Sequence, residues 1–288
     1  MADYLDKYDK KNSEFQMLIE SRKMTKEEYE KYEHWKRGQV HRRAYFQDMI
    51  DVLSEDTYNT NDIAAQMIHG HVPEVYAINA NFAAYEMDKQ IGYYTSYALY
   101  NREAVERLIR DNPDLLPKVK VNKRKDKAWN RKKFRNEITQ GILQGESNQK
   151  IAKRLERVIG MNKNTAIRNA RTATTSAQNA GKLDAYKHAE NIGVDVWKVW
   201  IATMDGSTRH SHRALDGQER KIDEPFDSEH GNIMYPGDPY ADPAELYNCR
   251  CRLSGLTKYS KFDAKDISKR FYRLPAGTTY EQWKQGAK

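Results

Sequence analysis

A seam of alanines constrains the fold of this chain more than any other sequence feature. Five alanines recur at alternating spacings of four and three residues, namely Ala166, Ala170, Ala173, Ala177 and Ala180. That spacing places them on one face of a helix. Alanine has little side chain to bury, so such a face is useful where another backbone can approach closely. The pattern therefore predicts a long helix, capped by Asn164 and stopped by Gly193, that packs tightly against a neighbour.

The chain before this seam is polar and helical in pattern. The whole chain of 288 residues has a mean hydropathy of −0.96 and is only 39% hydrophobic, which favours long solvated helices over one large core. Helices are predicted over 26–47, 74–110 and 129–143, and a fourth should end at Gly160. Gly70 and Pro73 predict a break in the first helical region.

The period of the pattern changes at Val194. Residues 194–203 are rich in β-branched and aromatic side chains, and Asp216-Gly217 favours a hairpin turn leading into a strand over 218–222. A closing strand is predicted over 249–256. The fold class is therefore α+β, with a mainly helical N-terminal region followed by a small C-terminal domain with a short antiparallel sheet. The expected divisions are a helical region 1–117, a basic segment 118–135, an α+β domain 136–256 and a polar tail 257–288.

Basic residues are concentrated in one segment. Between Lys118 and Arg135 the chain has ten Lys or Arg and one Asp, a local charge of +9 against +8 for the whole sequence. Such a segment can bind DNA phosphates without reading sequence, or it can be a solvated linker between domains. The candidate nucleic-acid-binding residues are Lys123, Arg124, Lys125, Arg131, Lys132 and Lys133.

The densest chemistry lies in residues 205–217 and 248–252. His212, Cys249 and Cys251 form a candidate zinc site, because thiolate and imidazole are the usual ligands of zinc. The Cys-x-Cys spacing is tighter than that of the common structural sites and would strain a disulfide, so reduced thiols are expected.

Two other interpretations of this cluster stay open. It can be a structural knot in which Arg209 pairs with Asp205 or Asp216, His212 bonds a backbone group and the cysteines are small buried hydrophobes. It can also be a metal-dependent hydrolase or nuclease site that uses Asp205, Arg209, His212 and Asp216 as base, anion clamp and acid.

Several ordered motifs resemble those of the tailed-phage minor head proteins, the head morphogenesis family of the Mu F and SPP1 type. They are Asn169-Ala170-Arg171-Thr172-Ala173, Gln178-Asn179-Ala180-Gly181, Trp200 to Asp205, Thr208-Arg209 with His212, Leu215-Asp216-Gly217, Tyr235 to Asp238 and Asn248-Cys249-Arg250-Cys251. Together they span about 135–255. The residues that match the core of the family motif are Asp205, Arg209, Asp216, Gly217 and Asn248.

The resemblance implies a minor capsid protein without catalytic activity. It would act at the portal vertex inside the virion head after assembly in the host cytoplasm, with the portal protein, other head proteins and double-stranded DNA as partners. It would contribute to head assembly and to packaging or ejection of DNA. No certain cofactor is implied, and zinc is the candidate. No apolar run reaches the roughly 18 residues that span a bilayer, so no membrane partner is expected.

Overall fold

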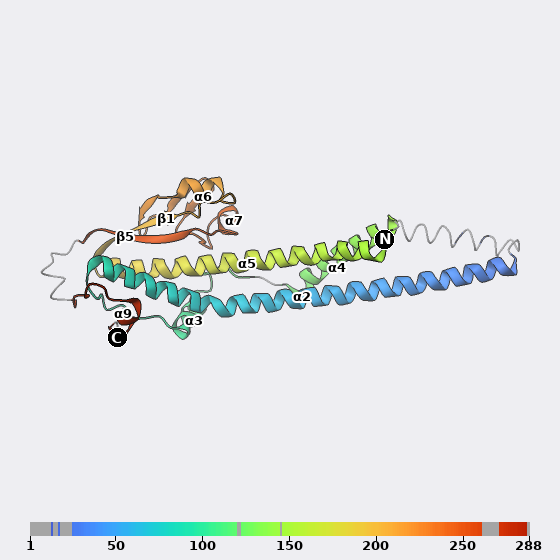
Figure 1. Ribbon diagram of the computed structural model, residues 1–288, viewed down its shortest axis with the longest axis horizontal. Helices are drawn as coiled ribbons and strands as arrows, with labels where there is room; N and C mark the ends of the chain where they lie inside the picture. The colour runs from blue at the N-terminus through green and yellow to red at the C-terminus, as the bar shows by residue number, and fades with distance from the viewer. Residues whose placement is uncertain are drawn as a thin grey trace. The chain divides into compact units, whose positions relative to one another are not determined.

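The computed structural model describes residues 25–119, 122–144, 146–260 and 271–286, together with Ser13 and Met17. In chain order the helices of these parts are α2 (Lys26–Ile91), α3 (Arg102–Asp111), α4 (Lys123–Leu143), α5 (Asn148–Asn191), α6 (His210–Leu215), α7 (Pro243–Leu246) and α9 (Tyr280–Gly286). The strands are β1 (Val194–Ile201), β2 (Glu219–Lys221), β3 (Phe226–Ser228), β4 (Gly231–Ile233) and β5 (Arg252–Ser260). Long helices followed by short antiparallel strands confirm the predicted α+β class (Figure 1).

The chain forms two compact units that interleave along the sequence. The first contains residues 1–64 and 121–166, and the second contains 65–120 and 167–288. Both α2 and α5 run through the two units. The sequence predicts successive segments instead, and whether those segments behave as domains stays a prediction.

The first unit has its own small core. Phe134 and Ile138 on α4 pack with Ile50 on α2 and with Ile151 and Leu155 on α5. The segment Lys123–Leu143 is therefore a packed helix rather than an extended linker, and Asn122 caps it by accepting the backbone N–H of Lys125.

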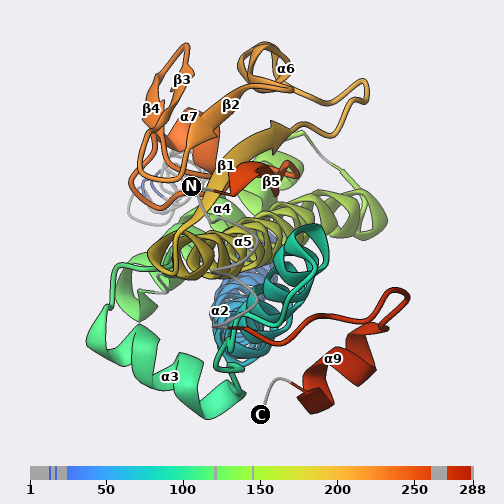
Figure 2. The same cartoon turned by 90° about the vertical axis from the view of Figure 1, so that its left-hand side faces the viewer.

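The second unit is layered around the C-terminal half of α5. Figures 1 and 2 show the strands over one face of α5 and the C-terminal half of α2 over another. Strand β1 lies at the centre of a three-stranded antiparallel sheet of order β2-β1-β5, and β3 pairs with β4. In β1 the side chains alternate between fully and partly buried, as expected for a strand with one face on the core.

The alanine seam packs as predicted in this second unit. Ala173, Ala177 and Ala180 are buried in the same core as Ala77 and Ala80 of α2. A Cβ atom built on Gly181 would lie 2.5 Å from the carbonyl oxygen of Tyr76. The two backbones are therefore as close as glycine and alanine allow.

Four predictions about where helices begin and end are wrong. Helix α2 continues through Pro73, and α5 continues through Gly160 and Asn164 without the predicted stop and cap. Residues 92–101, predicted as helix, are non-helical because α2 ends at Ile91 and Gly92 adopts a positive φ of 77°. The predicted stop at Gly193, with φ of 100°, is confirmed.

Candidate metal centre

Three buried side chains converge next to the central sheet. His212 comes from α6, and Cys249 and Cys251 lie just before β5. Their candidate ligand atoms all lie within 4.8 Å of one another, and Cys251 Sγ is 3.4 Å from His212 Nδ1. The predicted set of His212, Cys249 and Cys251 is thus brought together in space. His210, the neighbouring histidine, is exposed and lies instead 3.8 Å from Glu229.

The backbone that carries the cysteines is anchored to α5 by side chains. Thr175 donates its hydroxyl to the carbonyl of Cys249 at 2.8 Å. Asn179 donates its amide to the carbonyl of Cys251 at 3.2 Å and accepts the backbone N–H of Leu253 at 2.7 Å. Asn179 is 1% exposed. This explains why polar residues occur within an otherwise alanine-rich buried face, since they fix the start of β5 over the helix.

A buried carboxylate orients the histidine. Glu245 Oε2 lies 2.6 Å from His212 Nε2, and the hydroxyls of Ser211 and Ser228 donate to the same carboxylate at 3.1 and 2.5 Å. With Nε2 directed at Glu245, the imidazole presents Nδ1 to the thiols. A histidine that ligates a metal through one nitrogen commonly donates its other N–H to a carboxylate in this way.

The two thiols share a proton unequally. A hydrogen bond from Cys249 lowers the pKa of Cys251 to about 5, and contact with His212 adds to the effect despite burial. The pKa of Cys249 is raised well above its ordinary value, first by the same hydrogen bond and then by burial. The pair therefore favours the thiolate form at Cys251 and the protonated form at Cys249. A thiolate is the form of cysteine that binds metals.

A polar pocket of about 450 Å³ lies beside the thiolate. Cys251 and His212 line it together with the guanidinium-bearing side chains of Arg171, Arg209 and Arg250. A metal held by three protein ligands keeps a fourth position for water or another ligand. The pocket gives this centre a side from which such a ligand can enter.

The motif residues around the centre have structural roles. Asp205 forms a bidentate ion pair with Arg250, which holds the pKa of the Asp205 carboxyl far below its usual range. Asp216 accepts the backbone N–H of Ala202 at 2.7 Å. Gly217 and Asn248 both adopt positive φ, 74° and 59°, a region that glycine and asparagine tolerate best.

Two details of the predicted knot are wrong. Arg209 pairs with neither Asp205 nor Asp216, because its guanidinium donates to the carbonyls of Glu245 and Tyr247. His212 bonds the Glu245 side chain rather than a backbone group. Arg209 thus braces the chain that leads from α7 toward the cysteines.

The basic residues of the predicted DNA-binding segment lie on and around α4. Lys123, Arg124, Lys125, Arg131 and Lys132 are exposed and Lys133 is half-buried. Two cations of this helix are already paired with acids on α2, since Arg131 lies 2.6 Å from Asp51 and Lys127 pairs with Glu55. The net positive charge of the helix surface is therefore lower than the sequence suggests.

Two residues of consequence were not found from the sequence. Glu245 follows Asp242-Pro243 at the start of a helix, where an acid at this position normally accepts a backbone N–H of the first turn. Nothing in the neighbouring sequence therefore indicates that it contacts His212. The burial of Lys198 could have been predicted from the sequence. It is two residues from both Val196 and Trp200, so it lies with them on the buried face of β1. It has no exposed surface.

Fold and site together define an α+β domain in which a long helix supports a small sheet and a buried histidine–cysteine cluster. Residues 132–254 match the model of the family described as Phage Mu protein F like protein. The match confirms the predicted resemblance to phage minor head proteins.

Two relatives extend the comparison. The chain is 26% identical over 249 residues to the minor head protein GP7 of Bacillus phage SPP1, which covers 83% of this chain and 78% of the relative. It is 32% identical over 116 residues to the NAD(+)–arginine ADP-ribosyltransferase EFV of Enterococcus faecalis, which covers 40% of this chain and only 24% of that enzyme. No solved structure matches the chain significantly. In the parts described, no helix is both long and apolar enough to cross a membrane.

Proposed function

We propose that this chain is a non-catalytic minor head protein that acts at the portal vertex and contacts packaged double-stranded DNA. One observation carries the proposal: its similarity to the SPP1 minor head protein extends over 83% of this chain and 78% of that protein, well beyond the shared domain. Its setting would be the virion head, after assembly in the host cytoplasm, where it would assist assembly and the packaging or ejection of DNA.

The absence of catalysis is supported by the state of the two acids in the alternative hydrolase or nuclease site. Asp205 is held in its ion pair with Arg250, and Asp216 is bonded to a backbone amide. Neither carboxylate belongs to the metal-binding group of His212 among the described residues. The shared segment with an ADP-ribosyltransferase covers too little of that enzyme to carry its activity to this chain.

The α4 surface is the proposed DNA contact. Arg124, Lys125 and Lys132 are exposed and form no ion pair among the described residues, so their charges are available to phosphates. Arg131 contributes less because Asp51 already neutralises it. Lys123 and Lys133 lie over the rings of Tyr58 and Trp129 and can turn toward phosphates from there. The contact would be independent of base sequence.

Salt titration of DNA binding tests this surface. Changing Arg124, Lys125 and Lys132 to Gln should weaken binding of a random duplex and reduce the slope of log K against log salt by about three. The matched control changes Lys150, Lys153 and Lys163, three exposed lysines of α5, and should leave the α4 contribution intact. If both triple variants lose affinity equally, binding is a property of the overall charge and the α4 proposal fails.

Co-expression with the portal protein tests the proposed place of action. The chain should co-purify with portal assemblies, and labelled chain in assembled heads should lie at the portal vertex alone. A protein that is recovered evenly over the shell, or not at all with portal, contradicts this part of the proposal without affecting DNA binding.

We further propose that His212, Cys249 and Cys251 bind zinc, with the fourth position left to a ligand that enters from the neighbouring pocket. The donor set fits: one nitrogen and two sulfurs lie within 4.8 Å of one another, the pKa of the Cys251 thiol is lowered, and a carboxylate lies behind the imidazole. When bound, zinc would neutralise the thiolates and cross-link α6 to the start of β5. This would stabilise the domain at its centre.

Metal analysis with two histidine variants tests the site. His212→Ala should lose bound zinc and lower the melting temperature, whereas His210→Ala, the exposed neighbour, should retain one zinc ion per chain. In the zinc-loaded protein both thiols should resist modification until a chelator is added. Stoichiometric zinc in purified His212→Ala protein, or none in the native protein grown with zinc, would overturn the assignment.

A further inference from the structure

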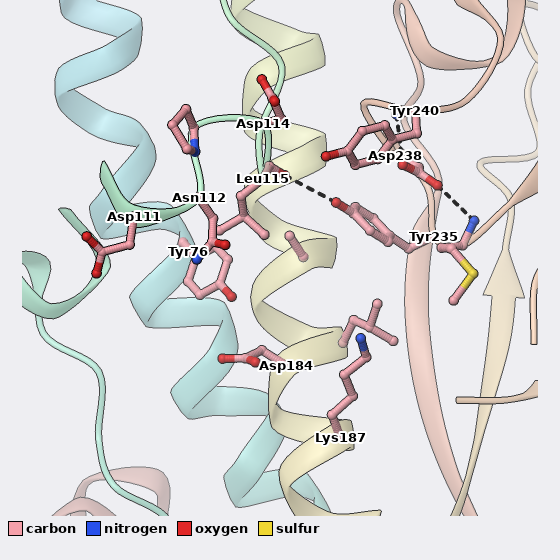
Figure 3. A pocket seen from close by; sticks show the side chains of 14 residues that line it. Tyr76, Asp111, Asn112, Asp114, Leu115, Asp184, Lys187, Tyr235, Asp238 and Tyr240 are labelled. Atoms are coloured by element: carbon pink, nitrogen blue, oxygen red, sulfur yellow. Dashed lines mark hydrogen bonds between the residues drawn. The ribbon is translucent and has the colours of Figure 1, made fainter. Parts of the chain in front are cut away.

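A second pocket, of about 510 Å³, opens in the C-terminal unit away from the cysteines (Figure 3). Its walls come from Tyr76 of α2, the turn that follows α3 at 111–115, Asp184 and Lys187 of α5, and the loop 234–240. Four separate stretches of the chain therefore meet around it. A pocket of this size accommodates a small molecule or a long side chain.

The walls of this pocket are acidic. Four carboxylates line it, those of Asp111, Asp114, Asp184 and Asp238, against the single ammonium of Lys187. Asp238 has a structural role, because its oxygens accept the backbone N–H groups of Met234 and Tyr240 at 3.0 and 2.9 Å. The other three acids contribute negative charge to the pocket.

Asp184 is only partly satisfied. Its Oδ2 accepts the hydroxyl of Tyr100 at 2.5 Å, and its Oδ1 has no hydrogen-bond donor among the described residues. Asp111 and Asp114 are exposed at the mouth, where Asp114 lies 3.3 Å from Lys118. Among the residues that the structure describes, these acids do not form a group close enough to hold a metal ion.

Tyr76 supplies an independent sign of a ligand. Its side chain is 1% exposed, yet its hydroxyl forms no hydrogen bond with any described residue, and Figure 3 shows the ring between α2 and α5. Burial raises the pKa of Tyr76 far above its usual range, and the charge of Asp184 adds to this. A ligand in the pocket that donates a hydrogen bond would satisfy this hydroxyl oxygen.

We propose that this pocket receives the guanidinium group of an arginine side chain on a partner protein. Guanidinium is planar, permanently charged and carries five N–H donors, so it can donate both to the Asp184 carboxylate and to the Tyr76 oxygen, while Asp111 and Asp114 add negative charge at the mouth. Tyr240, 79% exposed beside the mouth, offers an aromatic face on which an arginine can stack. Phosphate groups are excluded by the same charges, so this surface is separate in chemistry from the DNA contact on α4.

Binding of blocked amino acids to the native chain tests the proposal. N-acetyl-arginine amide should bind about tenfold more tightly than the citrulline derivative, which has the same shape without the charge. Asp184→Asn combined with Asp114→Asn should reduce arginine binding about tenfold, because the amide that replaces the Asp184 carboxylate can still accept the Tyr100 hydroxyl but lacks the charge. Asp223→Asn, an exposed acid outside the pocket, should bind as the native chain does.

Three results would overturn the proposal. Equal binding of arginine and citrulline derivatives would show that charge is not recognised. Equal loss in the Asp223→Asn control would show a nonspecific attraction. Tighter binding of spermidine than of the arginine derivative would make the occupant a free polyamine instead of a side chain. Circular dichroism of each variant ensures that only folded protein is compared, and none of these results bears on DNA or portal binding.

Discussion

At the scale of single residues, Lys198 shows how burial changes a charge. Its side chain has no exposed surface, and its ammonium donates to the carbonyls of Ile222 and Met234 at 2.9 and 3.0 Å. Burial, with a contribution from the charge of Lys187, lowers its pKa from 10.5 to about 8. The lysine thus links β1 to two loops by hydrogen bonds, while burial makes its charged form less favourable than in water.

Lys198 predicts a pH dependence of stability. Between pH 8 and 10.5 the unfolded chain binds the proton that the folded chain has released, so this residue adds stability as pH rises through that window. The gain is at most about 3 kcal/mol and is absent below pH 8. In Lys198→Met it should disappear, as measured by urea unfolding at several pH values. An unchanged difference between pH 8 and 10.5 would show that Lys198 is not desolvated, and the exposed Lys150→Met serves as control.

The cysteine pair gives a second prediction at this scale. Because the hydrogen bond from Cys249 is the main cause of the low pKa of Cys251, Cys249→Ser in metal-free protein should raise that pKa only modestly, since a hydroxyl still donates. Cys249→Ala removes the donor and should raise it further. Thiolate absorbance against pH measures both. Equal values in the two variants would show that His212, not Cys249, determines the charge of Cys251.

The candidate site could be found from the sequence only as a list of residue types. His212, Cys249 and Cys251 stand out because few other side chains bind metals, and their meeting in space follows that expectation. Glu245 could not be found, because its contact with His212 depends on how α7 packs against α6. The partners of Arg209 could not be predicted either, because it donates to backbone carbonyls, which every residue has and which no sequence pattern distinguishes.

At the scale of elements, the two glycines of α5 lie in opposite environments, one packed and one open. Gly181 faces the backbone of α2, where an added Cβ would lie 2.5 Å from the carbonyl oxygen of Tyr76, whereas Gly160 has nothing within 4 Å. Gly181→Ala should therefore destabilise the chain by about 1–3 kcal/mol. Gly160→Ala should stabilise it by about 1 kcal/mol through helix propensity. Chemical denaturation measures both, and two changes of the same sign would contradict the close approach of α2 and α5.

The same contrast explains which elements the sequence predicts correctly. The alanine seam and the alternation in β1 reflect packing over many residues, and both are confirmed. Pro73 and Gly160 are local signals for a helix end, worth about 3 and 1 kcal/mol. Buried residues on either side, such as Val72 and Tyr76 around Pro73, outweigh them. Pro and Gly therefore do not predict a helix end where the residues before and after them are buried in tertiary contacts.

At the scale of the whole molecule, two cores are joined by two continuous helices. The first core is centred on Phe134, which has no exposed surface, and the second includes Leu253 of β5, which is 1% exposed. A substitution in one core should destabilise that unit more than the other, because the two clusters of buried residues share no member. Because the units interleave along the sequence, α2 and α5 are the helices that contribute residues to both.

Hydrogen exchange on two reciprocal variants tests this organisation. Phe134→Ala should cost about 3–5 kcal/mol and speed exchange in α4 and in the parts of α2 and α5 that belong to the first unit, while amides of β1 and β5 keep their protection. Leu253→Ala should cost about 2–5 kcal/mol and have the opposite pattern. If either variant instead raises exchange evenly over both units, α2 and α5 couple the cores into a single cooperative unit. The helix segments beside residues 64 and 166, where α2 and α5 pass from one unit to the other, would then be the first place to look.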